Sequence, residues 1–114
     1  MKHIVTLIIM VCLIGLNYSL TAQTVYSVSS DTGANVKVYA ITDSTMADLW
    51  VFQASSDAGV GANNGIWFFT ADAASASKKL FFTNNLNDAE VWIYYTSIQS
   101  NAGWKNVTKT VLMN

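Results

Sequence analysis

The chain lacks most of the residue types on which common enzyme sites depend. Its 114 residues include no proline, no arginine, one histidine (His3) and one cysteine (Cys12). Beyond Cys12 the chain has neither thiol nor imidazole, which excludes Ser/His/Asp and Cys/His catalysis, the common zinc-ligand sets and any disulfide. We therefore predict that the protein is not an enzyme and that it has no catalytic residues, no metal ion and no cofactor.

Charged residues are also scarce. After Ala22 the chain has five lysines and seven acidic residues, a net charge of −2, and no run of like charges. A nucleic-acid binder needs a basic surface to neutralise phosphates, so we expect no nucleic-acid partner. The sequence identifies no other partner, although a glycan or a protein ligand fits an exported domain.

The first 22 residues have the features of a secretory signal peptide. A short positive start is followed by an apolar run, Ile4–Leu16, and then by a more polar exit with small residues. The run has 13 residues, whereas a membrane span needs roughly 20. We therefore favour a cleaved leader, residues 1–22, over a retained membrane anchor, and expect a secreted or periplasmic protein without a membrane span after cleavage near Ala22.

An internal repeat of about 13 residues fills the rest of the chain, residues 23–114, which we interpret as a single domain. Aromatic residues recur at spacings of 13, 13, 17, 13 and 13, with four extra residues in the third unit. Phe81 and Phe82 compete for the aromatic position of the fifth unit. The recurring aromatics are Tyr26, Tyr39, Phe52, Phe69, Phe82 and Tyr95.

Each unit contains one short run of apolar, β-branched and aromatic residues, bounded by Ser, Asp, Asn and Gly, as β-strands are. The intervening seven or so residues suffice for a turn or a single helical turn. Because runs such as 49–52 and 91–95 are apolar at every position, we expect both faces of the strands to be buried. The predicted fold is all-β: a compact repeat domain of about six short strands, in two small sheets or a closed barrel.

The acidic residues have two interpretations. Most lie in the polar connectors, where Asp commonly caps a turn by accepting bonds from backbone N–H groups. A carboxylate pair for acid/base chemistry is the alternative, and we favour capping because the repeat places these residues at equivalent sites. The candidates are Asp31, Asp43, Asp48, Asp57, Asp72, Asp88 and Glu90.

Four tryptophans, Trp50, Trp67, Trp92 and Trp104, are the candidate ligand-binding residues. Packing in the core is the first interpretation, and a platform for sugar rings or peptide is the second. Lysine and tryptophan also share one position of the repeat, which predicts Lys ammonium groups over Trp rings. The lysines at this position are Lys37, Lys79 and Lys105.

The repeat resembles the septoil knot domain family. The clearest matches are residues 34–39 and 47–52, a central Gly-Ile-Trp-Phe-Phe element at 65–69, and the closing Ala-Gly-Trp-Lys-Asn at 102–106. The resemblance covers roughly residues 25–107. It implies a seven-crossing torus knot of β-strands and brings no catalytic residues.

The function that these observations favour is an exported, non-enzymatic binding or structural module. The alternatives are a carbohydrate- or peptide-binding surface domain that uses exposed tryptophans, and a self-associating surface protein whose edge strands pair with neighbours.

The leader assignment predicts that Gln23 is the first residue of the secreted protein. Intact-mass measurement of material from the culture medium or periplasm should give the mass of residues 23–114. A mass that includes residues 1–22 would contradict the assignment and favour a retained anchor.

Overall fold

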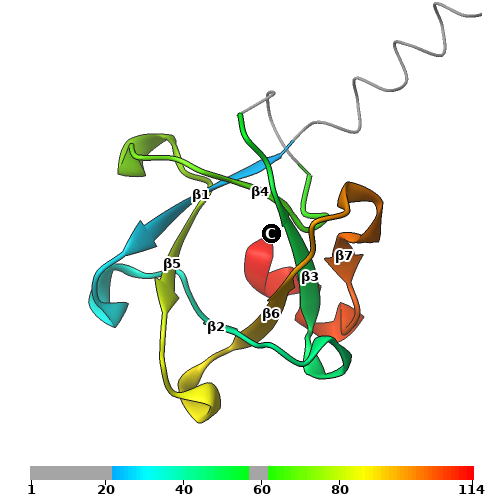
Figure 1. Cartoon of the computed structure of the whole chain (residues 1–114). Helices are drawn as coiled ribbons and strands as arrows, with labels where there is room; N and C mark the ends of the chain where they lie inside the picture. Colours follow the sequence, from blue (N-terminus) through cyan, green and yellow to red (C-terminus); the bar gives the residue numbers. More distant parts are fainter. Residues whose placement is uncertain (1–21, 57–61) are drawn as a thin grey trace, which may run out of the picture.

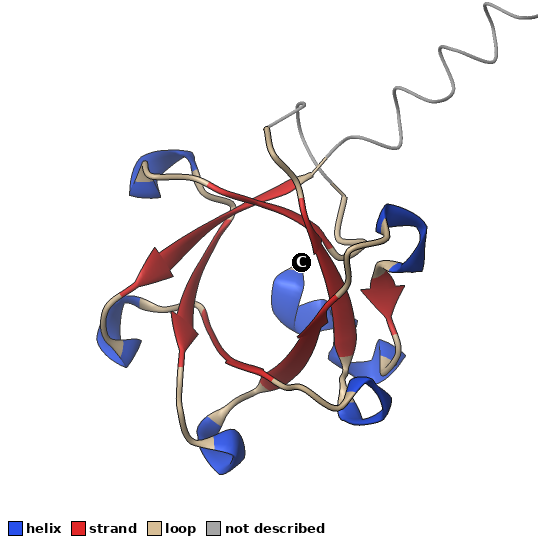
Figure 2. Cartoon of the chain, in the orientation of Figure 1, coloured by secondary structure: helices blue, strands red, loops and turns tan. Residues whose placement is uncertain are grey.

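The structure is a computed structural model that describes residues 22–56 and 62–114. The predicted leader, except Ala22, and Asp57 lie outside the described residues. Within them, short strands alternate with short 3-10 helices (Figure 2). The strands are β1 (Gln23–Val28), β2 (Val36–Ala40), β3 (Leu49–Gln53), β4 (Ile66–Phe69), β5 (Lys78–Phe82), β6 (Val91–Tyr95) and β7 (Gly103–Trp104). The helices are η1 (Asp31–Gly33), η2 (Ser44–Met46), η3 (Ala73–Ser75), η4 (Leu86–Asp88), η5 (Gln99–Asn101) and η6 (Val107–Met113).

Six parallel strands close into one barrel, which decides between the two predicted arrangements. The order around the barrel is β4-β1-β5-β2-β6-β3, and a further pairing of β3 with β4 closes it (Figure 1). The two-residue strand β7, beyond the six predicted, pairs antiparallel with the start of β3. If β7 is counted as a seventh place between β3 and β4, each strand lies two places further around the ring than the strand before it in the sequence. The chain therefore passes around the barrel twice, and the second pass interleaves with the first.

The interior is filled by one face of each strand. The burial alternates along β2, β3 and β6, with fully buried residues separated by half-buried ones. Helix η6 projects onto the centre of the ring in Figure 1, and its Met113 joins the core, whereas Val107 and Val111 of the same helix are exposed. The prediction that both faces of the strands are buried is therefore wrong for the outer face, whose described residues on these strands are only half-buried. The core consists of Val25, Val36, Val38, Leu49, Val51, Trp67, Leu80, Val91, Ile93 and Met113.

Half-buried aromatic and lysine side chains line the outer face, and they correct the predicted repeat by one residue. Lys37 is in register with Phe81, and Trp50 with Tyr94, so Phe81 and Tyr94 face outward. Phe69 and Phe82 instead pack against the core. Because side chains alternate with a period of two, a one-residue shift moves each aromatic to the other face. The outward aromatics Tyr26, Tyr39, Phe52, Phe68, Phe81 and Tyr94 are spaced by 13, 13, 16, 13 and 13 residues.

Four of the six 3-10 helices in the described residues begin with the same capping bond, and η1 and η5 lack it. The Asp43 and Asp72 carboxylates accept from the backbone N–H two residues ahead, at 3.0 and 3.1 Å. Asn85 and Asn106 make the same bond with their amide oxygens. These contacts confirm the predicted capping role for Asp43 and Asp72, and they show why Asp and Asn exchange freely at this site.

Gly65 directly precedes β4 and packs against the backbone of β3 and β7. Its φ is +86°, and a Cβ atom there would lie 2.5 Å from the Trp50 carbonyl oxygen and 2.7 Å from the Gly103 nitrogen. Both neighbours are backbone atoms, which cannot rotate away. The barrel therefore requires glycine at the point where β3, β4 and β7 meet.

We expect Gly65→Ala to lower the free energy of unfolding by roughly 3 kcal/mol or more, because strain at positive φ adds to a backbone clash. Gly33→Ala is the control, because its added Cβ would lie 4.0 Å from its nearest neighbour, Val28 Cγ1. Urea denaturation should place the control within about 1 kcal/mol of the native protein. Equal losses of unfolding free energy in both variants would show that Gly65 is not tightly packed against β3 and β7.

Candidate functional site

Asp48 is the most heavily engaged carboxylate of the described residues. It is 7% exposed, and its oxygens accept from the Trp92 backbone nitrogen at 2.8 Å and from Asn106 Nδ2 at 3.2 Å. Lys109 Nζ completes the set at 3.1 Å. These bonds join the start of β3 to β6 and to the C-terminal segment that contains η6. Asp48 therefore holds the fold together, and its oxygens are committed to that role.

Residues equivalent to Asp48 also bond to the neighbouring strand. Asn35 Oδ1 accepts from the Lys79 backbone nitrogen, and Glu90 Oε1 from that of Lys37. The Lys37 ammonium also donates to Asp88 Oδ1 at 3.1 Å, and this hydrogen bond raises the pKa of Lys37. The ion pair is solvent-exposed, so it is worth little to stability.

Trp50 and Trp92 fold back over the 3-10 turn that precedes each of them. Their indole N–H groups donate to the carbonyls of Ser44 and Leu86, at 3.2 and 3.1 Å. Trp50 also packs on Tyr94, with ring centroids 5.0 Å apart, and Lys105 Nζ lies 4.7 Å from its ring centroid. The predicted Lys–Trp stacking is thus confirmed for this one pair, and it occupies a face of Trp50 that a ligand would need.

Trp67 and Trp104 both contact the hydrophobic core. Trp67 is fully buried, so it has no ring face to offer a ligand, and its place in the candidate platform is a correction. Position 67 faces inward because the extra segment before β4 shifts the register relative to Trp50 and Trp92. Trp104 packs against the core and donates to Asn63 Oδ1 at 3.0 Å. A ligand platform remains a prediction for Trp50, Trp92 and Trp104 only.

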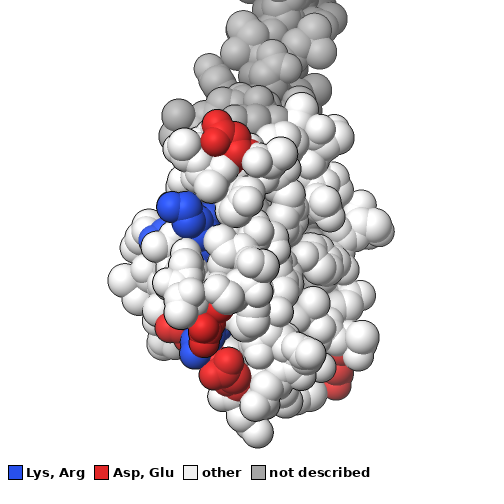
Figure 3. All heavy atoms as spheres, turned by 90° about the vertical axis from the view of Figure 1, so that its left-hand side faces the viewer, with Lys and Arg blue, Asp and Glu red and all other residues white. Residues whose placement is uncertain are grey.

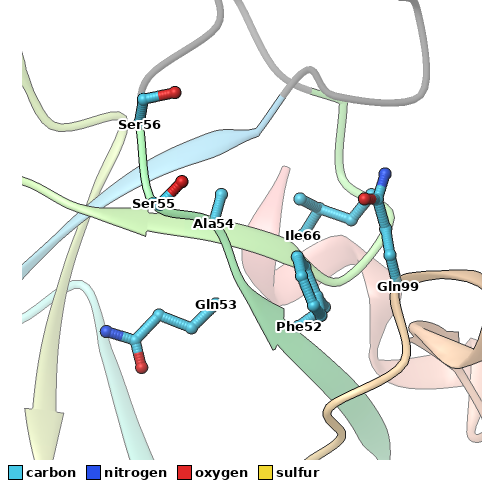
Figure 4. A pocket seen from close by; sticks show the side chains of 7 residues that line it. All are labelled: Phe52, Gln53, Ala54, Ser55, Ser56, Ile66 and Gln99. Carbon is cyan, nitrogen blue, oxygen red and sulfur yellow. The ribbon is translucent and has the colours of Figure 1, made fainter. Parts of the chain in front are cut away.

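A concave surface of the described residues lies instead beside Phe52, whose position in the repeat does not by itself indicate a binding role. Phe52 is in register with Ile66 across the junction of β3 and β4. Figure 4 shows their side chains together with that of Gln99, whereas Gln53 points to the other side of β3. Ala54, Ser55 and Ser56 complete a hollow of about 270 Å³.

Two further hollows adjoin this one. The first, of about 440 Å³, shares Phe52 and Gln53 and adds Tyr95, Thr96 and Ser97. The second, of about 340 Å³, shares Ile66 and Gln99 and adds Asn64 and Ser100. The described residues that line the three hollows include no charged side chain. They combine apolar side chains with amides and hydroxyls, as sites for uncharged ligands do.

Charge lies elsewhere on the molecule. The face formed by the left-hand side of Figure 1 carries acidic and basic side chains in small groups, separated by uncharged surface (Figure 3). Residues 22–56 and 62–114 contain no group of three His, Cys, Asp or Glu placed to hold a metal ion. No helix in the same ranges is long and apolar enough to cross a bilayer.

Comparison with known families gives one match. The model of the 7(1) septoil knot domain family matches residues 22–105. Neither the curated proteins nor the solved structures contain a match.

The capping carboxylates predict part of the pH dependence of stability. Hydrogen bonds from Ser75 and from the Ala74 backbone lower the pKa of Asp72 below its usual 3.8. A lowered folded-state pKa contributes stability that is present above the unfolded-state pKa and is lost as the pH falls through the folded-state value. Asp72→Asn keeps an oxygen for the cap, as Asn85 does, but cannot titrate.

The difference in melting temperature between the native protein and Asp72→Asn should therefore be constant above about pH 5 and change as the pH falls below 4. Asn85→Asp is the reverse substitution, because it places a titrating carboxylate at an equivalent cap. Its melting temperature should fall more steeply at acid pH than that of the native protein. A native-minus-variant difference that stays constant from pH 7 to pH 2 would contradict this account.

Proposed function

The chain belongs to the septoil knot domain family, and from that premise we propose that it is an exported, non-enzymatic binding module. The observation that carries the proposal is the series of uncharged hollows around Phe52 on an otherwise closed barrel. Export rests on the leader pattern of residues 1–22. The barrel supplies a rigid frame, and the segments that follow β3 and β6 supply the binding groups.

A non-enzymatic role is supported by the commitments of the acidic side chains. Asp43 and Asp72 cap separate turns, and Asp48 bonds to three groups within the fold. General acid/base catalysis needs groups that face a bound substrate. The residues around Phe52 offer amides and hydroxyls in place of such groups.

Self-association through strand edges receives less support than ligand binding. Each of the strands β1–β6 has a partner on both sides within the barrel. Only the two-residue strand β7 has a single partner among the described strands. Edge pairing between copies needs unpaired backbone N–H and C=O groups on a strand, and a closed ring of strands has few of them.

We also infer that the chain is threaded as the family name describes. The order of strands around the barrel requires the second pass of the chain to interleave with the first. Threading is rare among folds because it requires a chain end to pass through a formed loop.

Ligand binding is tested with a panel of oligosaccharides and uncharged peptides, monitored by amide chemical shifts of the isotopically labelled protein. A binding member should shift the signals of residues around Phe52 and Ile66. Phe52→Leu should weaken its binding by about tenfold, equivalent to roughly 1.4 kcal/mol. Phe81→Leu is the matched control, since Phe81 occupies the equivalent position of the repeat on β5, and it should bind normally. Shifts confined to other surfaces would contradict the proposal.

Threading predicts slow refolding. All-β domains of this size refold in about milliseconds to seconds, and we expect recovery from full denaturation to take on the order of minutes. The chain has no proline and no cysteine after Cys12, so neither prolyl isomerisation nor disulfide exchange can produce the slow phase. Stopped-flow Trp fluorescence measures the rate, and full recovery within milliseconds would argue against threading.

A further inference from the structure

We propose that the hollows around Phe52 bind an uncharged polysaccharide chain, an inference that rests on the proposed binding function. The floor of the central hollow is apolar. Phe52 and Ile66 stand side by side on the outer face, since they are in register on β3 and β4. A sugar ring offers an apolar C–H face that can lie against such a floor while its hydroxyl groups point to the sides.

The rim of the hollow supplies groups for those hydroxyls. Ser55 and Ser56 follow β3 and border the hollow with their hydroxyl groups (Figure 4). Asn64 and Ser100 provide an amide and a hydroxyl in the adjoining hollow. Amides and hydroxyls both donate and accept hydrogen bonds, which matches the mixed donor and acceptor character of sugar hydroxyls.

The absence of charge from the described lining selects among ligands. A charged ligand group gains electrostatic stabilisation from a site only where an opposite charge lies close to it. None of the described residues that line the three hollows is Lys, Asp or Glu. An acidic glycan, a phosphorylated ligand or a charged peptide would find no oppositely charged partner among these described residues, so the proposed ligand is neutral.

The backbone around the site argues for a sugar over a peptide. An extended peptide gains affinity by pairing with free backbone groups at a sheet edge. At this site the Phe52 nitrogen donates to the Gly65 carbonyl, and the Ala54 nitrogen donates to the Trp67 carbonyl. Recognition must therefore use side chains, as recognition of a sugar does.

The arrangement of the hollows favours a chain over a single sugar. The central hollow shares Phe52 and Gln53 with one neighbour, and Ile66 and Gln99 with the other. A ligand seated at Phe52 therefore has two adjoining hollows into which it can extend. Affinity should rise from monosaccharide to trisaccharide, as successive rings occupy successive hollows, and change little beyond that length.

The test is calorimetric titration of the folded protein with cello-, xylo-, malto- and chito-oligosaccharides of one to six residues. At least one neutral series should bind, with affinity that rises up to about three residues. Binding should be nearly the same in 0.05 and 0.5 M NaCl, because screening does not affect an uncharged ligand. Oligogalacturonate is the charged control and should not bind.

Two variants locate the site. Phe52→Leu should weaken the binding of the best oligosaccharide by about tenfold, equivalent to roughly 1.4 kcal/mol, whereas Phe81→Leu should leave it unchanged. Binding of uncharged peptides but of no saccharide, with shifts at Phe52, would overturn the sugar assignment and leave the binding function standing. Binding of oligogalacturonate in preference to the neutral series would overturn the claim of neutrality. Absence of binding by every saccharide and peptide would overturn both proposals.

Discussion

The closed ring of six parallel strands sets one constraint on every unit of the repeat: one face of each strand must fill a narrow interior. Val38, Leu49, Val51 and Ile93 do so with aliphatic side chains, and Trp67 supplies the largest group. The outer residues of β2, β3 and β6 are only half-buried, and the connectors provide part of their cover. This is why Trp50 and Trp92 lie back on their own 3-10 turns.

The order of the strands follows from the same ring. Because consecutive strands are separated by one place, the second pass of the chain fills the gaps that the first pass leaves. The two passes come closest at Gly65, which leaves no room for a Cβ atom between β3 and β7. The C-terminal segment is then tied down by Asp48 and inserts Met113 into the core.

Much of this architecture could be predicted from the sequence, because the repeat places the same side chains at the same structural positions. Spacing and composition predicted the strands and the capping role of Asp43 and Asp72. The sequence could not choose between Phe81 and Phe82, since adjacent aromatics offer one ring to each face and only the strand register decides. It could not place the strands around the barrel either, because every pairing among the described strands except that of β3 with β4 joins residues 40 or more apart. The sequence could not indicate the hollow at Phe52, because its lining comes from three separate segments. The tryptophans were instead predicted as ligand-binding residues from their residue type alone.

The order of the strands is the central claim, and engineered cysteine pairs test it directly. In a chain with Cys12→Ser, Tyr26 and Lys79 are paired across β1 and β5, whereas Tyr26 and Tyr39 lie on strands that β5 separates. A disulfide needs Cα atoms within about 4.4–6.8 Å. Oxidation should therefore cross-link the Tyr26→Cys/Lys79→Cys variant and leave Tyr26→Cys/Tyr39→Cys as free thiols, as peptide mapping would show. A cross-link in the second variant and none in the first would contradict the account.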